Sequence, residues 1–297
     1  MRIFYSERYT IDLPDGHRFP MEKYRLIRLA LLREGVVRDS DLLEPPLATR
    51  DQLLLAHSPD YVDAICRGSV SPDVIRRIGF PWSEALVLRS LATVGGALAA
   101  AEAALQDGIS GNLAGGTHHA LRNAGEGYCV FNDLAVVALW LLSRKRVRRV
   151  AIIDLDVHQG NGNSEILGGR EDVFIFSMHG AKNYPFRKVP STLDIALPDY
   201  TSDAEFLDAL AQHLPKVLDF QPDIVLYQAG VDPLKEDALG RLALTHHGLM
   251  ERDRMVLSAC KRLGIPVSLA LGGGYAKPIE LTIEAHVGTY KAVREIF

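Results

Sequence analysis

A chain of 297 residues fits one large α/β domain or two small ones, and 47% hydrophobic with 24% charged residues are ordinary values for a soluble globular protein. The formal net charge of −4 gives no electrostatic reason to expect direct nucleic-acid binding. The three cysteines are an odd count without a Cys-x-x-Cys pair, which argues for a reducing compartment and against a cysteine-rich zinc module.

The sequence shows neither a secretory signal nor a membrane span. Met1–Glu7 reaches charged residues too soon for the apolar segment of a signal peptide. The longest apolar run, Leu134–Leu142, is much shorter than the about 20 residues that cross a bilayer. We therefore expect a cytoplasmic protein, and the sequence does not indicate its oligomeric state.

The first predicted elements are a short strand at 2–5 and a helix at 21–34 that ends at Gly35, a typical residue beyond a helix C-terminus. Another short helix opens at His57–Tyr61. The chain begins with strands and helices in alternation.

The longest predicted helix covers 83–105, with Ser83 as its N-cap. Its Gly95–Gly96 pair costs about 1 kcal/mol of helix propensity per glycine, a cost that close packing against a sheet would explain. Later helices are predicted at 133–144, 203–220, 245–263 and 278–296. The basic run Arg144–Arg149 is expected to be a solvated helix end, because cations suit that position.

Five nearly continuous apolar strands each lead into a cluster of Gly, His, Asp or Tyr; these segments are 111–119, 150–158, 172–179, 223–232 and 266–275. Alternating strands and helices predict a mostly parallel sheet with right-handed crossovers and helices on both faces. We find no repeat or linker, so the expected fold is a single α/β domain over residues 1–297. Ligands of such sheets bind beyond the carboxyl ends of the strands.

Asp154, Asp156 and His158 alternate with apolar residues, and period two on an extended backbone would place all three on one face. Two carboxylates and an imidazole in a buried position indicate a bound cation, since unpaired buried charge is very costly. A structural Asp–His hydrogen-bond network without metal is the alternative.

Asp232 follows another strand, where Gly230 lets the backbone turn, and it is the natural third ligand beside Asp156 and His158. On its own it would equally suit a loop cap. Three protein ligands with an open position are typical of catalytic Zn²⁺, and the oxygen-rich set would also accept Fe²⁺.

Two tandem histidine pairs occur in the chain. His118–His119 follow a glycine-rich turn at a strand end, from which both rings could enter a cleft. His246–His247 lie at a predicted helix start, away from any strand end, and are expected at the surface. A third candidate, Tyr275, follows Gly272–Gly274, which permit a close backbone approach to a ligand; a packed aromatic is the plainer alternative.

These motifs together resemble the histone deacetylase family within the arginase/deacetylase superfamily. The matching stretches run in family order over nearly the whole chain; they are 16–24, 57–62, 115–120, 125–133, 152–162, 227–234, 237–242 and 271–275. The HQGNG stretch and the short length most resemble the class IV branch and its bacterial relatives.

The resemblance implies a zinc-dependent amidohydrolase that removes acetyl or longer acyl groups from an amine such as acyl-lysine. It assigns Asp156, His158 and Asp232 to the metal. The catalytic residues that it implies are His118, His119, Asp154, Asn161 and Tyr275. Among them, His119 would be the general base and acid, and Tyr275 would donate a hydrogen bond to the substrate carbonyl. The substrate would contact Gly127, Tyr128, Tyr184, Leu239 and Gly273.

A structural K⁺ or Na⁺ is also implied, bound by Asp154, Asp156, His158, Ser177 and Met178. Two positions depart from the family pattern. Asn161 stands where well-known members have an Asp, and this predicts a lower pKa for His119 than the ring would have beside an Asp partner. No Asp at Gly79–Trp82 matches the family's rim residue, which grips the substrate backbone.

Three other functions remain open at this point. The first is hydrolysis of an acylated small molecule such as an acetylpolyamine. The second is an arginase-like reaction with two metals, which would need further bridging carboxylates where Gln159–Asn161 stand. The third is acyl binding without hydrolysis, against which the complete set of His118, His119 and Tyr275 argues.

Overall fold

The computed structural model describes all 297 residues and is built around one eight-stranded parallel sheet in the order β2-β1-β3-β8-β7-β4-β5-β6. The strands are β1 (Arg2–Phe4), β2 (Leu42–Leu43), β3 (Ile109–Asn112), β4 (Val150–Asp154), β5 (Val173–Gly180), β6 (Leu193–Leu197), β7 (Ile224–Gln228) and β8 (Val267–Ala270). The predicted α/β class with a parallel sheet is confirmed.

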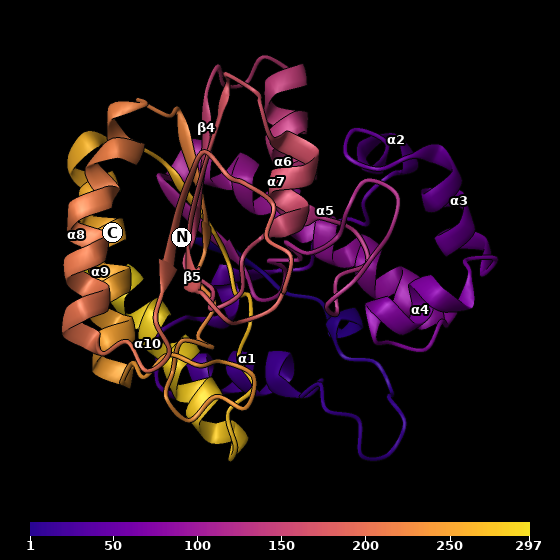
Figure 1. Cartoon of the computed structure of the whole chain (residues 1–297), viewed down its shortest axis with the longest axis horizontal. Helices are drawn as coiled ribbons and strands as arrows, with labels where there is room; N and C mark the ends of the chain where they lie inside the picture. Colours follow the sequence, from indigo (N-terminus) through magenta and orange to yellow (C-terminus); the bar gives the residue numbers. More distant parts are fainter.

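Helices cover both faces of the sheet, as Figure 1 shows with α8 and α9 on one side and α5 and α6 on the other. The helices are α1 (Lys23–Arg33), α2 (Arg50–Leu53), α3 (Pro59–Arg67), α4 (Pro72–Ile78), α5 (Glu84–Asp107), α6 (Asp133–Ser143), α7 (Asn161–Leu167), α8 (Asp203–Asp219), α9 (His246–Leu263) and α10 (Ile279–Ile296). Each face carries its own apolar core, because the central strands are buried on both sides.

The predicted helix at 83–105 is α5, and the Ser83 hydroxyl accepts a hydrogen bond from the Leu86 N–H as its N-cap. The glycine pair does allow close packing. A Cβ on Gly96 would lie 2.6 Å from Asn112 Oδ1 on β3, and one on Gly95 would lie 1.8 Å from the Pro46 carbonyl oxygen, which belongs to a loop. The sheet therefore explains only the second glycine.

By length and composition α5 is also the one helix apolar enough to cross a membrane, but 72% of its apolar window is buried inside the protein. It is a core helix that packs on β1, β3 and β8 and lies beside α6 on the same face of the sheet.

The short elements α2, α4, α7, β2 and β6 were not predicted, because they lack a periodic apolar pattern of their own; β6, for example, is a largely half-buried edge strand. Of the two surface predictions, the first is confirmed and the second only in part. The basic residues after α6 are largely exposed before β4 begins, and His247, in the first turn of α9, is exposed; its neighbour His246 is half-buried, with Nε2 2.9 Å from the Leu281 carbonyl oxygen.

Candidate active site

The predicted site residues converge beyond the carboxyl ends of β3, β8, β7 and β4, which are consecutive in the sheet. The turn after β3 supplies His118 and His119, and the loop after β4 supplies Asp156 and His158. Asp232 follows β7, and Tyr275 follows β8. Neighbouring parallel strands thus deliver their polar residues to one place.

Three side chains form a buried cluster at the centre of this site. Nδ1 of His158 lies 3.0 Å from Asp156 Oδ1 and 3.0 Å from Asp232 Oδ2. One ligand atom from each residue can be chosen so that all lie within 4.8 Å of one another, and this is the one such cluster in the chain. Asp₂His is a donor set that suits a catalytic divalent ion with an open position.

The strand geometry expected for this cluster is wrong in one respect. β4 ends at Asp154, so Asp156 and His158 lie in irregular backbone beyond it and not on an extended face. Asp154 instead turns to His118, with 2.7 Å between Asp154 Oδ2 and His118 Nδ1.

Backbone N–H groups hold the two ligand carboxylates. Val157 donates to Asp232 Oδ1 at 2.8 Å, and Gly273 donates to Asp156 Oδ2 at 2.8 Å. Gly273 must be a glycine, since a Cβ there would lie 1.9 Å from Asp232 Oδ2. The backbone after β8 therefore helps to fix the metal ligands.

The electrostatics of the cluster also favour a cation. Burial together with the charge of Asp156 raises the pKa of Asp232 to about 7. Burial opposes protonation of His158, but Asp232 and Asp156 raise its pKa to about 10. Two carboxylates thus require a positive charge between them, and a divalent ion supplies it when it displaces the His158 proton.

The tandem histidines are aimed by a buried carboxylate. Asp133, at the start of α6, accepts hydrogen bonds at 2.8 Å from the N–H groups of Gly116 and Thr117. This interaction fixes the turn that carries His118 and His119, whose ring centroids are 4.1 Å apart.

The two histidines have different partners and opposite pKa shifts. Burial lowers the pKa of His118, but the carboxylates of Asp154 and Asp156 outweigh it and raise the value to about 9. Nδ1 of His119 lies 2.7 Å from the amide oxygen of Asn161, and burial beside His118 and His158 holds the His119 pKa well below its ordinary value. These shifts favour a protonated His118 and a neutral His119, whose Nε2 makes no hydrogen bond within the chain.

Asn161 is itself oriented by a carboxylate. Its side-chain N–H donates to Glu126 Oε1 at 2.8 Å, which turns the amide oxygen toward His119. The resulting chain, His119–Asn161–Glu126, keeps a hydrogen on His119 Nδ1, because an amide oxygen only accepts. The Glu126 contribution was not predicted from the sequence.

Tyr275 presents its hydroxyl to the cavity. Its backbone N–H donates to Asp237 Oδ2 at 2.6 Å, and the hydroxyl has no partner within the chain. Burial and the charges of Asp232 and Asp156 hold the Tyr275 pKa well above its ordinary value. The hydroxyl therefore stays protonated and can donate.

A cavity of about 520 Å³ leads from the surface to this cluster. His119, His158 and Tyr275 lie at its inner end. The predicted channel residues Gly127, Tyr128, Tyr184 and Leu239 line it, and the Tyr184 ring stands nearly perpendicular to that of His119, with centroids 4.9 Å apart. Gly273 lines a second, smaller cavity of about 30 Å³ deeper in the protein, beside the buried cations Lys23 and Arg89.

The residues predicted for a monovalent cation lie behind this cluster. Asp154 on β4 pairs in register with Ser177 on β5, and Met178 follows as a buried residue. The Ser177 hydroxyl is within 2.9 Å of His179 Nδ1. A K⁺ or Na⁺ ion there stays a prediction.

Two further buried carboxylates escaped prediction, although both stand in segments that the sequence singled out. Asp133 ends the 125–133 segment, and Asp237 opens the 237–242 segment. Asp237 also accepts from the N–H groups of Leu239 and Gly240, which fixes the loop at the channel wall. The one sequence signal for Asp133 is its position as an acidic residue directly before the apolar run of a predicted helix.

Comparison with known proteins adds independent findings. Residues 17–289 match the family model described as "Histone deacetylase domain". An uncharacterized protein of Picosynechococcus is 44% identical over 296 residues, 99% of either chain. Histone deacetylase 2 of Arabidopsis thaliana is 31% identical over 93% of this chain and 74% of its own. The acetoin utilization protein AcuC of Staphylococcus aureus is 32% identical over 80% of this chain and 67% of its own.

The fold has a solved counterpart. The crystal structure of the HDA15 HD domain superimposes with a TM-score of 0.82, over 99% of this chain and 91% of that chain, at 22% sequence identity. This likeness supports the arginase/deacetylase-like arrangement of the sheet and helices.

Proposed function

Because this chain belongs to the histone deacetylase family, we propose that it is a zinc-dependent amidohydrolase that removes an acetyl group from an amine such as acyl-lysine. The observation that carries this proposal is the position of the Asp156–His158–Asp232 cluster, which shares one cavity with a neutral histidine and an unpartnered tyrosine hydroxyl. The complete set favours hydrolysis over acyl binding alone.

The cluster fits a divalent ion in number, donor type and charge. Asp156, His158 and Asp232 would hold Zn²⁺, or Fe²⁺, with a position left for water or substrate. Such an ion would polarise the amide carbonyl as a Lewis acid and would lower the pKa of bound water to about 7. A single cluster of this kind does not favour the two-metal arginase reaction.

The side chains around the ion have distinct roles in this proposal. His119 takes a proton from the attacking water at Nε2 and then gives it to the leaving amine, while Asn161 keeps the Nδ1 hydrogen in place. The Tyr275 hydroxyl donates to the carbonyl oxygen as negative charge develops there. The His118 imidazolium, held by Asp154, adds positive charge beside the same centre.

The cavities suggest a short acyl group. Tyr128 and Tyr184 can flank the methylene chain of the amine in the outer channel. The second cavity of about 30 Å³, which Asp156, His158 and Gly273 help to line, leaves little room beyond the reacting carbonyl, and this favours a short acyl group. Lys23 and Arg89 border that space and would attract the carboxylate product.

A matched substrate panel tests this proposal. Zinc-loaded protein is assayed on one lysine peptide acylated with acetyl, butanoyl, octanoyl or myristoyl groups, with and without chelator. We expect acetyl to be hydrolysed at least about tenfold faster than octanoyl, since the excess chain must displace packed protein. Chelator should abolish turnover. Equal turnover of myristoyl and acetyl peptides would contradict the acetyl preference, and no turnover of any peptide would contradict acyl-lysine as the substrate.

A further inference from the structure

The mouth of the channel is lined by positive charges. Its four charged side chains are all cationic, and no Asp or Glu lines the cavity; they are Arg76, Arg77, Lys182 and Arg241, here called the cationic rim. All four are exposed. They stand out because the whole chain is net negative, with a formal charge of −4.

Nearby carboxylates neutralise only part of this charge. Arg76 pairs with Asp73 on the outer side of α4. Lys182 and Arg241 share one carboxylate, that of Asp199, at 3.5 and 3.3 Å.

Arg77 forms no ion pair, so four cations face two carboxylates. The other acidic residue near this wall, Glu126, is half-buried, accepts from the Asn161 amide and lies beside Tyr184, so even with its charge counted the four cations outnumber the carboxylates. The rim therefore keeps a net positive charge at the point where a substrate enters.

Arg77 is also fixed to the channel wall by its backbone. The carbonyl oxygens of Arg77 and Ile78 accept hydrogen bonds from the N–H groups of Gly127 and Tyr128, at 3.0 and 2.8 Å. Tyr128 is a wall of the channel, so the end of α4 is held against it. The backbone of Arg77 is therefore fixed beside the channel, and its guanidinium, which forms no ion pair, lies at the channel mouth.

A large apolar surface adjoins these charges. Phe186 is 88% exposed, lines the same mouth, and packs edge-on against Tyr184 with ring centroids 6.2 Å apart. The rim therefore offers cationic groups and one aromatic face, and it offers no carboxylate to a cationic carrier.

We propose, on the basis of the proposed deacetylase function, that the cationic rim selects acetylated amines whose carrier bears a carboxylate beyond the channel. A carboxylate there is attracted by the rim and can accept hydrogen bonds from Arg77. An acetylated polyamine carries ammonium groups at the same place and is repelled. The rim thereby favours carboxylate-bearing acetylated amines over acetylated polyamines, between which the metal site alone does not discriminate.

Three small amides of matched length isolate the effect of charge: 6-acetamidohexanoate, its neutral primary amide, and N-acetylcadaverine. The same acetyl-lysine peptide with Asp, Ser or Arg neighbours extends the series to peptides, which distinguishes a small carrier from an acidic protein segment. Turnover and equilibrium binding are measured on the zinc-loaded protein at low salt and at about 0.5 M NaCl, where surface charges are screened.

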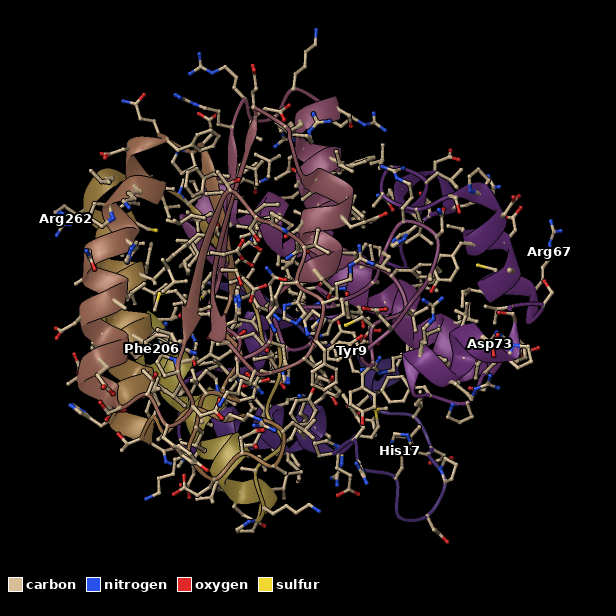
Figure 2. All side chains as sticks on the ribbon, in the orientation of Figure 1. Tyr9, His17, Arg67, Asp73, Phe206 and Arg262 are labelled. Atoms are coloured by element: carbon tan, nitrogen blue, oxygen red, sulfur yellow. The ribbon has the colours of Figure 1, made fainter.

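At low salt we expect kcat/KM to fall by about tenfold from the anionic to the cationic member of either series, mainly through KM, and this ratio to approach one at high salt. Arg77→Glu should abolish or reverse the preference. Arg262→Glu makes the same change in net charge on the opposite edge of the molecule from α4, as the labels of Arg262 and Asp73 in Figure 2 show, and should leave the preference intact.

Preferred turnover or binding of the cationic members would overturn the proposal, and so would a preference that Arg77→Glu does not change. Failure of the deacetylase function looks different. In that case not even the neutral amide is hydrolysed, while salt-sensitive binding of the anionic members would still support selection by the rim.

Discussion

A Tyr275→Phe variant is expected to lose about 10²–10³-fold in kcat while it retains its metal. The hydroxyl has no partner within the chain, lies at the inner end of the channel, and has a pKa held well above its ordinary value, so its one function in this account is to donate to the substrate oxygen. Removal of this oxygen leaves the Asp156–His158–Asp232 cluster untouched. Turnover and metal content of the same preparation are the two measurements.

Tyr290→Phe is the matched control for this variant. Its hydroxyl likewise has no hydrogen-bond partner, but it is fully buried on α10, outside the channel. We expect the control to keep its kcat. Metal loss in Tyr275→Phe, or unchanged turnover, would contradict the role given to Tyr275.

The second large effect is expected from His119→Ala, which should lower kcat by about 10²–10⁴-fold because the proton acceptor is removed. His119 is suited to this role, since burial and neighbouring positive charge hold its pKa low and Asn161 fixes its Nδ1 hydrogen. His247→Ala removes the exposed member of the other tandem pair and should leave turnover unchanged. A small loss in His119→Ala would assign the proton transfer to another group.

The pH profile of Asn161→Asp tests the same role without removal of the imidazole. A carboxylate in place of the amide favours the protonated ring and raises the His119 pKa. A general base works only when it is unprotonated, so activity is lost as pH falls through its pKa. The acidic limb of kcat/KM should therefore move to higher pH, and an unmoved limb would speak against His119 as the base.

Much of the fold followed from apolar patterning. Strands buried on both faces are continuous apolar runs, so β4, β5, β7 and β8 were placed within a few residues, and with them the parallel sheet. The position of the candidate site followed as well, because parallel strands deliver the residues after their carboxyl ends to a common edge. His118, His119, Asp156, His158, Asp232 and Tyr275 are in fact gathered there.

The missing parts depend on contacts between loops, which no local pattern encodes. Asp133, Asp237 and Glu126 accept hydrogen bonds from residues that tertiary folding brings near, so their roles appear only in the structure. The cationic rim likewise joins α4 to loops more than a hundred residues away in sequence. The period-two argument failed beyond Asp154 because the strand ends there.

The most direct test of the account is the metal content of the protein compared with its activity, for the wild-type chain and for Asp232→Ala. We predict one zinc or iron per chain in the wild type, turnover that disappears with chelator and returns with one equivalent of metal, and an inactive Asp232→Ala variant that binds none. Full activity of the metal-free wild-type protein, or of Asp232→Ala, would contradict the account.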